Sequence, residues 1–224
     1  MTLEENNTAS SKLSAFIEKN RKTFLIALLA VIVAVAGFIV LEKIKSASTV
    51  KALEVIDEIT FTLTDGSAAL GDSELQARRD DALDNLAAYT SKSGPAGVRA
   101  NMLCAELVYQ QKQYDKAIGY WKAAAEKGKK AYTAPLSYYN IASSYEQLGN
   151  TDEALDYYKK AAETTDYVLK AHAQFSYGRL LETKGNYSEA VAVYKKLNDD
   201  SPVVKWANLA KSRIIALEAE GKVE

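Results

Sequence analysis

The sequence predicts an all-α protein in which a single membrane-spanning helix precedes a stack of helical hairpins. Three observations lead to this prediction. Residues 24–41 form an uninterrupted apolar run, a pattern of alanine and aromatic residues recurs three times, and the 224-residue chain contains only 3 prolines. Apolar runs of about 18 residues can cross a bilayer, and repeats of roughly 20–50 residues are typical of stacked supersecondary units.

The charge balance narrows the class of partner. Lys and Arg total 28 and Asp and Glu total 29, which gives a net charge of −1. Proteins that bind nucleic acid usually carry an excess of positive charge, so we expect no nucleic-acid partner. About 180 residues remain beside the apolar run, which suits one soluble domain.

The apolar run reads FLIALLAVIVAVAGFIVL and contains no charged side chain. As a helix it would extend roughly 27 Å, close to the hydrocarbon thickness of a bilayer. The alternative is a core helix of a soluble protein, but such helices usually keep a polar stripe, which this run lacks. We therefore predict a transmembrane helix at 24–41 after a short polar tail at 1–23.

A cleaved signal peptide is a second alternative, because small residues occupy positions 46–48. Signal peptides have a shorter apolar region of roughly 7–15 residues, and three charged residues, Glu42, Lys43 and Lys45, precede any cleavage site here. An uncleaved anchor is the better interpretation.

Basic residues beside a membrane helix favour its cytoplasmic end. Four precede the run, at Lys12, Lys19, Arg21 and Lys22, and three follow it, at Lys43, Lys45 and Lys51. The expected orientation has a cytoplasmic N-terminus. In a bacterium, the rest of the chain would then lie in the periplasm, held at the inner (cytoplasmic) membrane.

A repeated helix is evident when the chain is compared with itself. QYDKAIGYWKAA at 113–124, NTDEALDYYKKAA at 150–162 and NYSEAVAVYKKL at 186–197 align so that Ala117, Ala154 and Ala190 coincide, 37 and 36 residues apart. An aromatic residue follows each alanine by four positions, at Trp121, Tyr158 and Tyr194. Residues at i and i+4 share one helix face, so each segment presents the same packed face.

Each repeated helix follows a turn and another amphipathic helix. Gly149-Asn150 and Gly185-Asn186 supply a residue suited to a left-handed helix end and a polar residue able to cap the next helix. Lys112-Gln113 stands at the corresponding place in the first repeat, which lacks the glycine. The repeating unit is therefore predicted to be a helical hairpin.

The second unit resembles the tetratricopeptide repeat, with Tyr138, Ala142, Tyr145, Ala154, Tyr158 and Ala161 at consensus positions. The third keeps Gly178, Ala190, Tyr194 and Pro202 but departs at Gln174 and Leu181, and the first keeps Ala105, Ala117, Trp121 and Ala124 but departs at Asn101 and Val108. The resemblance implies a tetratricopeptide-like solenoid over 47–220, with units at about 98–125, 135–166 and 171–202. Helices at 47–63 and 72–91 would form a divergent extra hairpin, and 205–219 would cap the open stack.

The order of these parts resembles the bacterial ancillary SecYEG translocon subunit family. The most similar stretches are AAYTSKSGPAGVRANMLCAELVYQQKQYDKAI at 87–118 and RKTFLIALL beside the apolar run. This resemblance implies an inner-membrane protein whose periplasmic domain associates with the translocon and with periplasmic chaperones. An adaptor for another envelope complex, such as one for cytochrome maturation or division, would share the same features.

The sequence offers no set of residues for catalysis. His172 is the only histidine and Cys104 the only cysteine, and both fall among helical packing positions. The segment GSAALG at 66–71 lacks the spacing and the lysine of a phosphate-binding loop. We expect no enzymatic activity, no cofactor, no metal and no small-molecule substrate.

The first helices of stacked hairpins line a concave groove, where protein partners would bind. Its predicted residues are Arg99, Met102, Glu106, Tyr109, Leu136, Tyr139, Ser143, Glu146, His172, Phe175, Arg179 and Glu182. Met102, Tyr139 and Phe175 are expected to form an apolar stripe that stands apart from the hairpin cores. The alternative is that the protein's own N-terminal hairpin or cap fills the groove. Tetratricopeptide domains that clamp a C-terminal carboxylate place Lys and Asn here, and this chain does not.

Overall fold

The structure is a computed structural model, which describes residues 3–129, 132–165 and 167–223. Its described part is all-helical and contains no strand, so the predicted fold class is confirmed. The chain divides into two compact units, Met1–Val50 and Lys51–Glu224. Helix α1 (Leu3–Thr64) runs through the boundary between them.

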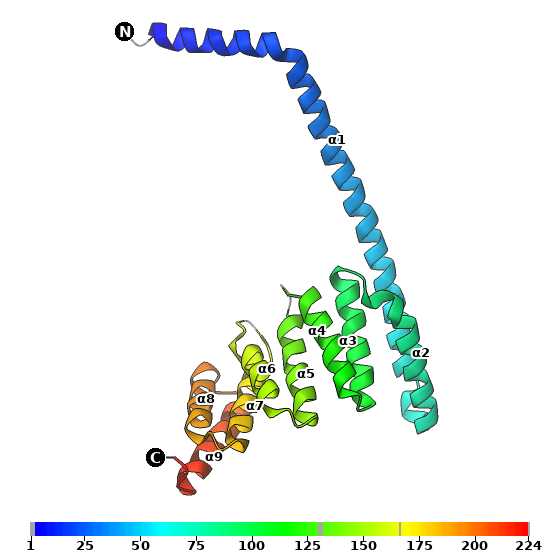
Figure 1. The fold of residues 1–224 in the computed structure, drawn as a ribbon, viewed down its shortest axis with the longest axis vertical. Coiled ribbons are helices and arrows are strands. Elements are labelled where there is room, and N and C mark those ends of the chain that lie inside the picture. Colours follow the sequence, from blue (N-terminus) through cyan, green and yellow to red (C-terminus); the bar gives the residue numbers. More distant parts are fainter. Residues whose placement is uncertain (1–2, 130–131, 166, 224) are drawn as a thin grey trace. The chain divides into compact units, whose positions relative to one another are not determined.

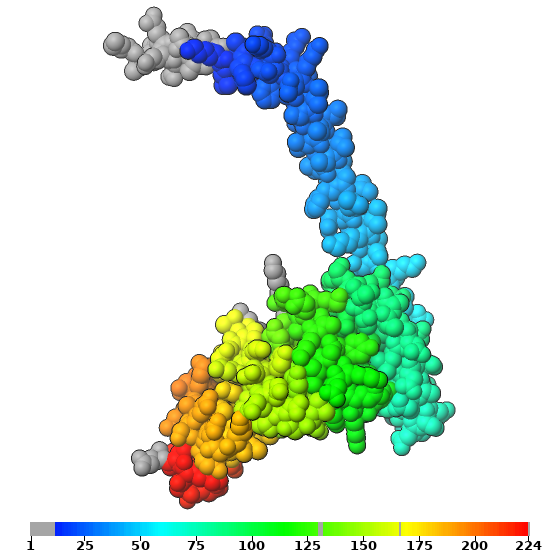
Figure 2. All heavy atoms as spheres, viewed as in Figure 1, coloured from blue at the N-terminus to red at the C-terminus, as the bar shows by residue number. Residues whose placement is uncertain are grey.

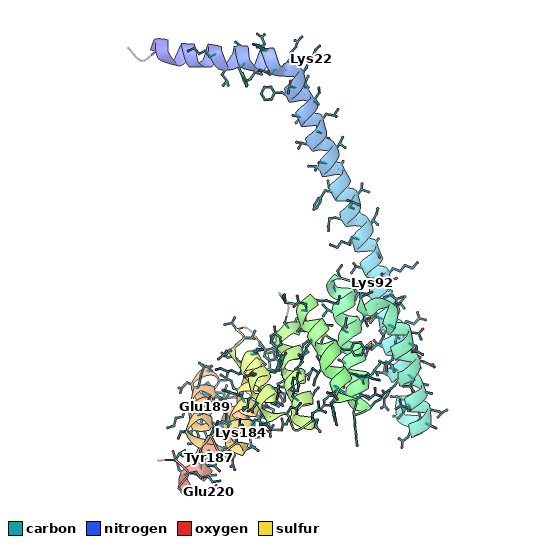
Figure 3. All side chains as sticks on the ribbon, viewed as in Figure 1. Lys22, Lys92, Lys184, Tyr187, Glu189 and Glu220 are labelled. Atoms are coloured by element: carbon teal, nitrogen blue, oxygen red, sulfur yellow. The ribbon has the colours of Figure 1, made fainter. Side chains whose placement is uncertain are left out.

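The first unit consists of the N-terminal part of α1. The segment expected to be a polar tail is helical from Leu3, because extending an existing helix costs little once its first turns have formed. The helix bends near Lys22 (Figure 3). Close to this bend the Asn20 amide Nδ2 donates to the Phe16 carbonyl oxygen at 2.8 Å, and such insertion into the backbone hydrogen-bond ladder commonly bends helices.

The apolar run in α1 is exposed along its whole length. Its most apolar window of 18 residues has a mean hydropathy of 3.2, and none of that window is buried. A core helix would be mostly buried, so length, composition and exposure together suit a membrane-crossing helix. A signal sequence near the N-terminus can also form a long apolar helix, so the uncleaved anchor stays a prediction.

The described part of the second unit begins with the last turns of α1 and continues through eight further α-helices. These are α2 (Asp72–Thr90), α3 (Gly94–Gln110), α4 (Tyr114–Lys127), α5 (Thr133–Gln147), α6 (Thr151–Glu163), α7 (Lys170–Thr183), α8 (Tyr187–Asp200) and α9 (Lys205–Ala219), with a 3-10 turn, η1 (Ser67–Ala69), before α2. Figure 1 shows α3 to α8 as three antiparallel hairpins side by side, and Figure 2 shows them in continuous contact. The hairpins α3–α4, α5–α6 and α7–α8 occupy the three sequence repeats.

The hairpin cores contain the residues that repeat in the sequence. Ala117, Ala154 and Ala190 are fully buried, and the aromatic residues four positions later are at most 4% exposed. Gly178 on α7 shows how close the helices come, because a Cβ at this position would lie 2.5 Å from Tyr194 Cε1. The small residues therefore let the two helices of each hairpin approach, while the aromatic residues fill the space beside them.

The three hairpin turns have one conformation despite their different sequences. Lys112, Gly149 and Gly185 have φ values of 60°, 77° and 82°. The next backbone amide donates to a carbonyl five residues earlier in each turn, as from Asn150 to Tyr145 at 2.9 Å. Lys112 thus adopts the left-handed backbone that its position requires, although glycine would adopt it at lower cost.

Helix α9 ends in the same way as the first helix of a hairpin. Gly221 has a φ of 67°, and the Lys222 amide donates to the Leu217 carbonyl at 3.0 Å. Ala207, Ala210 and Leu217 of this helix are buried. The predicted cap is therefore placed like the first helix of a further hairpin.

Candidate interaction surface on the first helices

The residues predicted for the groove lie on α3, α5 and α7, one set on each first helix. Met102, Tyr139 and Phe175 occupy equivalent positions and are all half-buried. Tyr139 and Phe175 pack against the core of the last two hairpins, and Met102 packs against the core formed by α3, α4 and α5. The expectation of a stripe apart from the cores is wrong, because long side chains on the first helices fill the spaces between adjacent hairpins.

Aromatic rings from α5, α7 and α9 cover the C-terminal end of this surface. The Tyr139 hydroxyl lies 2.9 Å from His172 Nε2, and the ring of Trp206 stacks on that of His172 at a centroid distance of 3.9 Å. Phe175 lies on the same indole, with centroids 5.4 Å apart. Part of the predicted groove is therefore occupied by the protein's own last helix.

The environment of His172 disfavours its protonated form. Burial lowers the pKa of the imidazole below its usual value, and the charge of Arg179 lowers it further. Burial also raises the pKa of Tyr139, so this phenol keeps its hydrogen. The pair is thus a neutral contact that holds α5 and α7 together.

Two glutamates predicted for the rim of the groove form ion pairs with arginines of the next helical unit. Arg179 Nη2 donates to both carboxylate oxygens of Glu146, at 2.7 Å and 2.8 Å. Arg213 on α9 forms an ion pair with Glu182. The same carboxylates accept hydrogen bonds from tyrosines of the second helices, Tyr158 at 3.0 Å and Tyr194 at 3.2 Å. A set of one tyrosine, one glutamate and one arginine therefore recurs at two successive junctions.

The first junction, between α3 and α5, uses a neutral contact at the corresponding place. Tyr109 and Ser143 lie with their hydroxyl oxygens 3.0 Å apart. Arg99 forms an ion pair with Asp57 of α1. Glu106 is exposed and accepts a hydrogen bond only from Gln110 of its own helix among the described contacts, at 3.0 Å.

An apolar cavity of about 420 Å³ opens where the last turns of α1 meet α2 and α3. Its lining includes Leu63, Leu75, Leu103 and Leu107, with Arg79 and Glu106 among the polar residues. All of these residues belong to the second unit. The N-terminal end of the surface therefore offers an open apolar site, whereas the C-terminal end is filled by Trp206.

Sequence reasoning missed several residues of this surface. Trp206 and Arg213 lie on α9, outside the three recognised repeats, and the repeat pattern gave no reason to place them in the groove. Glu146 and Glu182 could have been matched with Tyr158 and Tyr194, because each tyrosine follows its glutamate by 12 residues. The cavity has no sequence signal, since it depends on how loosely α1 packs on α2 and α3.

The described residues offer neither a cluster of metal ligands nor a reactive thiolate. No group of three or more His, Cys, Asp or Glu residues is placed to hold a metal ion in that part of the chain. Burial raises the pKa of the Cys104 thiol to about 12, so a reactive thiolate is not available at neutral pH.

Comparison with known proteins identifies the repeats. Family models described as tetratricopeptide repeat match residues 69–133 and 133–197. The chain carries tetratricopeptide repeats. A TPR repeat-containing protein of Treponema pallidum (strain Nichols) is 32% identical over 154 residues, which cover 67% of this chain and 64% of that protein. The chain thus spans less than two thirds of this relative.

Comparison with solved structures supports the repeat fold. The tetratricopeptide-like repeats of a putative kinesin light chain from Podospora anserina superpose with a TM-score of 0.56 at 12% identity, covering 77% of this chain and 88% of that one. A Rap protein complexed with competence and sporulation factor gives a TM-score of 0.48 at 24% identity, covering 59% and 38% of the two chains. The repeat solenoid is the feature shared with the first of these.

Proposed function

We propose that this chain is a membrane-anchored scaffold whose tetratricopeptide domain binds other proteins. Tetratricopeptide repeats indicate a protein-interaction scaffold, and the helix at 24–41 has the length and composition of an anchor. The observation that carries the proposal is the open cavity at the α1–α3 end of the first-helix surface. It offers buried apolar area next to charged groups, which suits a helical or extended segment of a partner.

The partner class that we propose is the Sec translocon together with periplasmic chaperones. The similarity of residues 87–118 and 21–29 to the ancillary SecYEG subunit family supports this choice. The bacterial relative is consistent with a bacterial envelope protein. The chain would then lie in the inner membrane with its N-terminus in the cytoplasm and its repeats in the periplasm.

The position of the cavity supports different roles for the predicted site residues at the two ends of the surface. Met102 and Glu106 lie on α3, the helix whose residues line the cavity, and Glu106 contributes to that lining. Tyr139, His172 and Phe175 are engaged in contacts within the domain. We therefore assign partner binding to the α3 end of the surface and a structural role to the α7 end. The scaffold needs no enzymatic step.

Site-specific photocrosslinking in intact membranes tests this proposal. A photoreactive amino acid at Glu106 should capture translocon or chaperone subunits, and the same group at Lys159 on α6, an exposed position away from the cavity, should not. Capture of cytochrome-maturation or division proteins at Glu106 would assign the scaffold to that complex instead. Equal capture from both positions would show that the cavity is not the recognition site.

A further inference from the structure

Connections between hairpins all lie at one edge of the repeat domain, because consecutive helices are antiparallel. We call this edge the connection edge; its described residues are 91–93, 128–129, 132, 164–165, 167–169 and 201–204. The turns within the hairpins, at 111–113, 148–150 and 184–186, lie at the opposite edge. In Figure 3, Lys92 marks the connection edge and Lys184 the turn edge.

Three of the four connections expose a large apolar side chain. Tyr132, Val168 and Val203 are 73%, 92% and 91% exposed, and each stands just before the first helix of a hairpin or of the cap. None of the large exposed hydrophobic residues falls in the turns at 111–113, 148–150 and 184–186, whereas Phe61, which is 65% exposed, lies in the last turn of α1 at that edge. Single exposed apolar residues are ordinary on protein surfaces, but their recurrence at one position in successive repeats indicates a shared environment.

Acidic residues are distributed unequally between the starts of the described helices. Every helix that starts at the turn edge carries an acidic residue in its first turn, and these are Asp72, Glu74, Asp115, Asp152, Glu153 and Glu189. The helices that start at the connection edge, α3, α5, α7 and α9, carry none. Helix dipoles favour acidic residues at all eight starts, so helix stability does not explain the difference.

Lysines stand in or beside each connection, at Lys92, Lys129, Lys170 and Lys205. Some acidic groups near this edge are paired, since Glu126 lies 2.6 Å from Lys129 and Asp200 lies 3.3 Å from Lys170. Glu163 at the end of α6 and Asp199 in the last turn of α8 also lie here, so the edge has little net charge. Its distinguishing feature is apolar side chains flanked by lysines, which is the composition of segments at a membrane interface.

The chain enters the repeat domain at the connection edge. Asp57 of α1 pairs with Arg99 near the start of α3, and Leu63 lines the cavity with Leu107 near the end of α3. Helix α1 therefore runs parallel to α3, which places Lys51 level with the α2–α3 connection. Only residues 42–50 separate this point from the apolar run, a distance of roughly 14 Å as a helix and about 30 Å fully extended.

We propose that the connection edge rests on the surface of the bilayer. Tyr132, Val168 and Val203 would enter the headgroup region, where apolar and tyrosine side chains are favoured, and the neighbouring lysines would meet lipid phosphates. The proposal rests on the membrane anchor proposed above, because the short segment at 42–50 is what keeps this edge beside the lipid. The cavity at the far ends of α1 and α3 would then face away from the membrane.

The test uses the full chain reconstituted in vesicles of phosphatidylcholine and phosphatidylglycerol. Tyr132→Cys, Val168→Cys and Val203→Cys are each labelled with an environment-sensitive nitrobenzoxadiazole dye, and quenching by headgroup spin-labelled lipid is measured. Asn150→Cys and Asn186→Cys at the turn edge are the matched controls, and the native Cys104 is buried. The three connection-edge dyes should be quenched at least twofold more strongly than the two controls.

Flotation of the unlabelled chain with the vesicles separates this inference from the proposed anchor. Flotation with equal quenching at both edges would overturn the membrane contact and leave the anchor intact. Failure to float would overturn both. In detergent, the connection-edge dyes could instead become shielded as the protein concentration rises. This result would show that a second copy of the chain covers the edge, and it would also overturn the membrane contact.

Discussion

Glu146 on α5 accepts hydrogen bonds from two helices at once, from Arg179 Nη2 on α7 at 2.7 Å and from the Tyr158 hydroxyl on α6 at 3.0 Å. Burial raises the pKa of Tyr158, and the nearby carboxylate raises it further, so the phenol remains a donor at neutral pH. One carboxylate therefore joins the two helices of its own hairpin to the next hairpin.

Glu146→Ala should lower the free energy of unfolding by about 1–3 kcal/mol, because the buried Tyr158 hydroxyl loses its acceptor. Arg179→Ala should cost less, about 1 kcal/mol or under, since the arginine side chain is 43% exposed and water screens the pair. Adding Tyr158→Phe to Glu146→Ala should recover part of the loss. Urea unfolding measures all three, and no recovery in the double variant would contradict this account.

The sequence was sufficient to predict the fold and the residues that share one side of each helix. It was insufficient to predict which residues of the neighbouring helices contact that side. The spacing of Ala117, Ala154 and Ala190 reports which residues share a helix side, because helical period and repeat length together determine it. It does not report which residue of the next unit lies opposite. Arg213 pairs with Glu182 from a position on α9 that does not match Arg179 on α7, so repeat spacing could not reveal it.

Lys112→Gly should stabilise the domain by up to about 1 kcal/mol. Left-handed backbone is strained for lysine and unstrained for glycine. The free energy gained by relieving this strain should exceed the entropic cost of a more flexible unfolded chain. Gly149→Ala is the reciprocal change in the next hairpin and should destabilise by about 1 kcal/mol. Thermal unfolding followed by circular dichroism gives both values. If Lys112→Gly did not stabilise the domain and Gly149→Ala did not destabilise it, the two turns would not share one conformation.

Gly178→Ala should destabilise the last hairpin by about 1–3 kcal/mol. The added Cβ would lie 2.5 Å from Tyr194 Cε1 and 2.9 Å from Cδ1, and the buried ring has little room to move. Gly119→Ala is the matched control on α4, where no atom lies within 4 Å of the new Cβ. The control should instead gain about 0.5–1 kcal/mol from better helix propensity. If both substitutions changed the free energy of unfolding in the same direction, the close approach of α7 and α8 would be contradicted.

Acidification should weaken the contact between α5, α7 and α9 through His172. Its folded-state pKa is lowered by burial and by Arg179, so between that value and the unfolded value of about 6.5 the unfolded chain binds more protons. Stability should be complete above about pH 6.5 and fall as the pH drops toward the folded-state pKa. His172→Phe removes this titration, and urea midpoints at about pH 7.5 and pH 5.5 should then differ less than in the wild type. Equal pH dependence in both proteins would assign the effect to other groups.

Blocking the cavity tests partner binding without removing a core residue. Tyr139→Ala and Phe175→Ala are poor tests, because both side chains support the hairpin cores and their loss would unfold the domain as readily as it would weaken binding. Ala68 in η1 is exposed and lines the cavity, so Ala68→Trp should fill the cavity with an indole while the helices keep their packing. Ala87→Trp on α2, also exposed but away from the cavity, is the matched control. The melting temperatures of both variants should stay close to that of the wild type.

Crosslinking from Glu106 should then separate the two tryptophan variants. If a partner inserts an apolar side chain among Leu63, Leu103 and Leu107, Ala68→Trp should reduce capture at least tenfold, the loss expected when a buried anchor worth about 1.4 kcal/mol or more is excluded. Ala87→Trp should capture as the wild type does. Undiminished capture by a folded Ala68→Trp protein would show that the partner does not enter the cavity. The exposed convex side formed by α4, α6 and α8 would then be the surface to examine, beginning with Lys159→Glu.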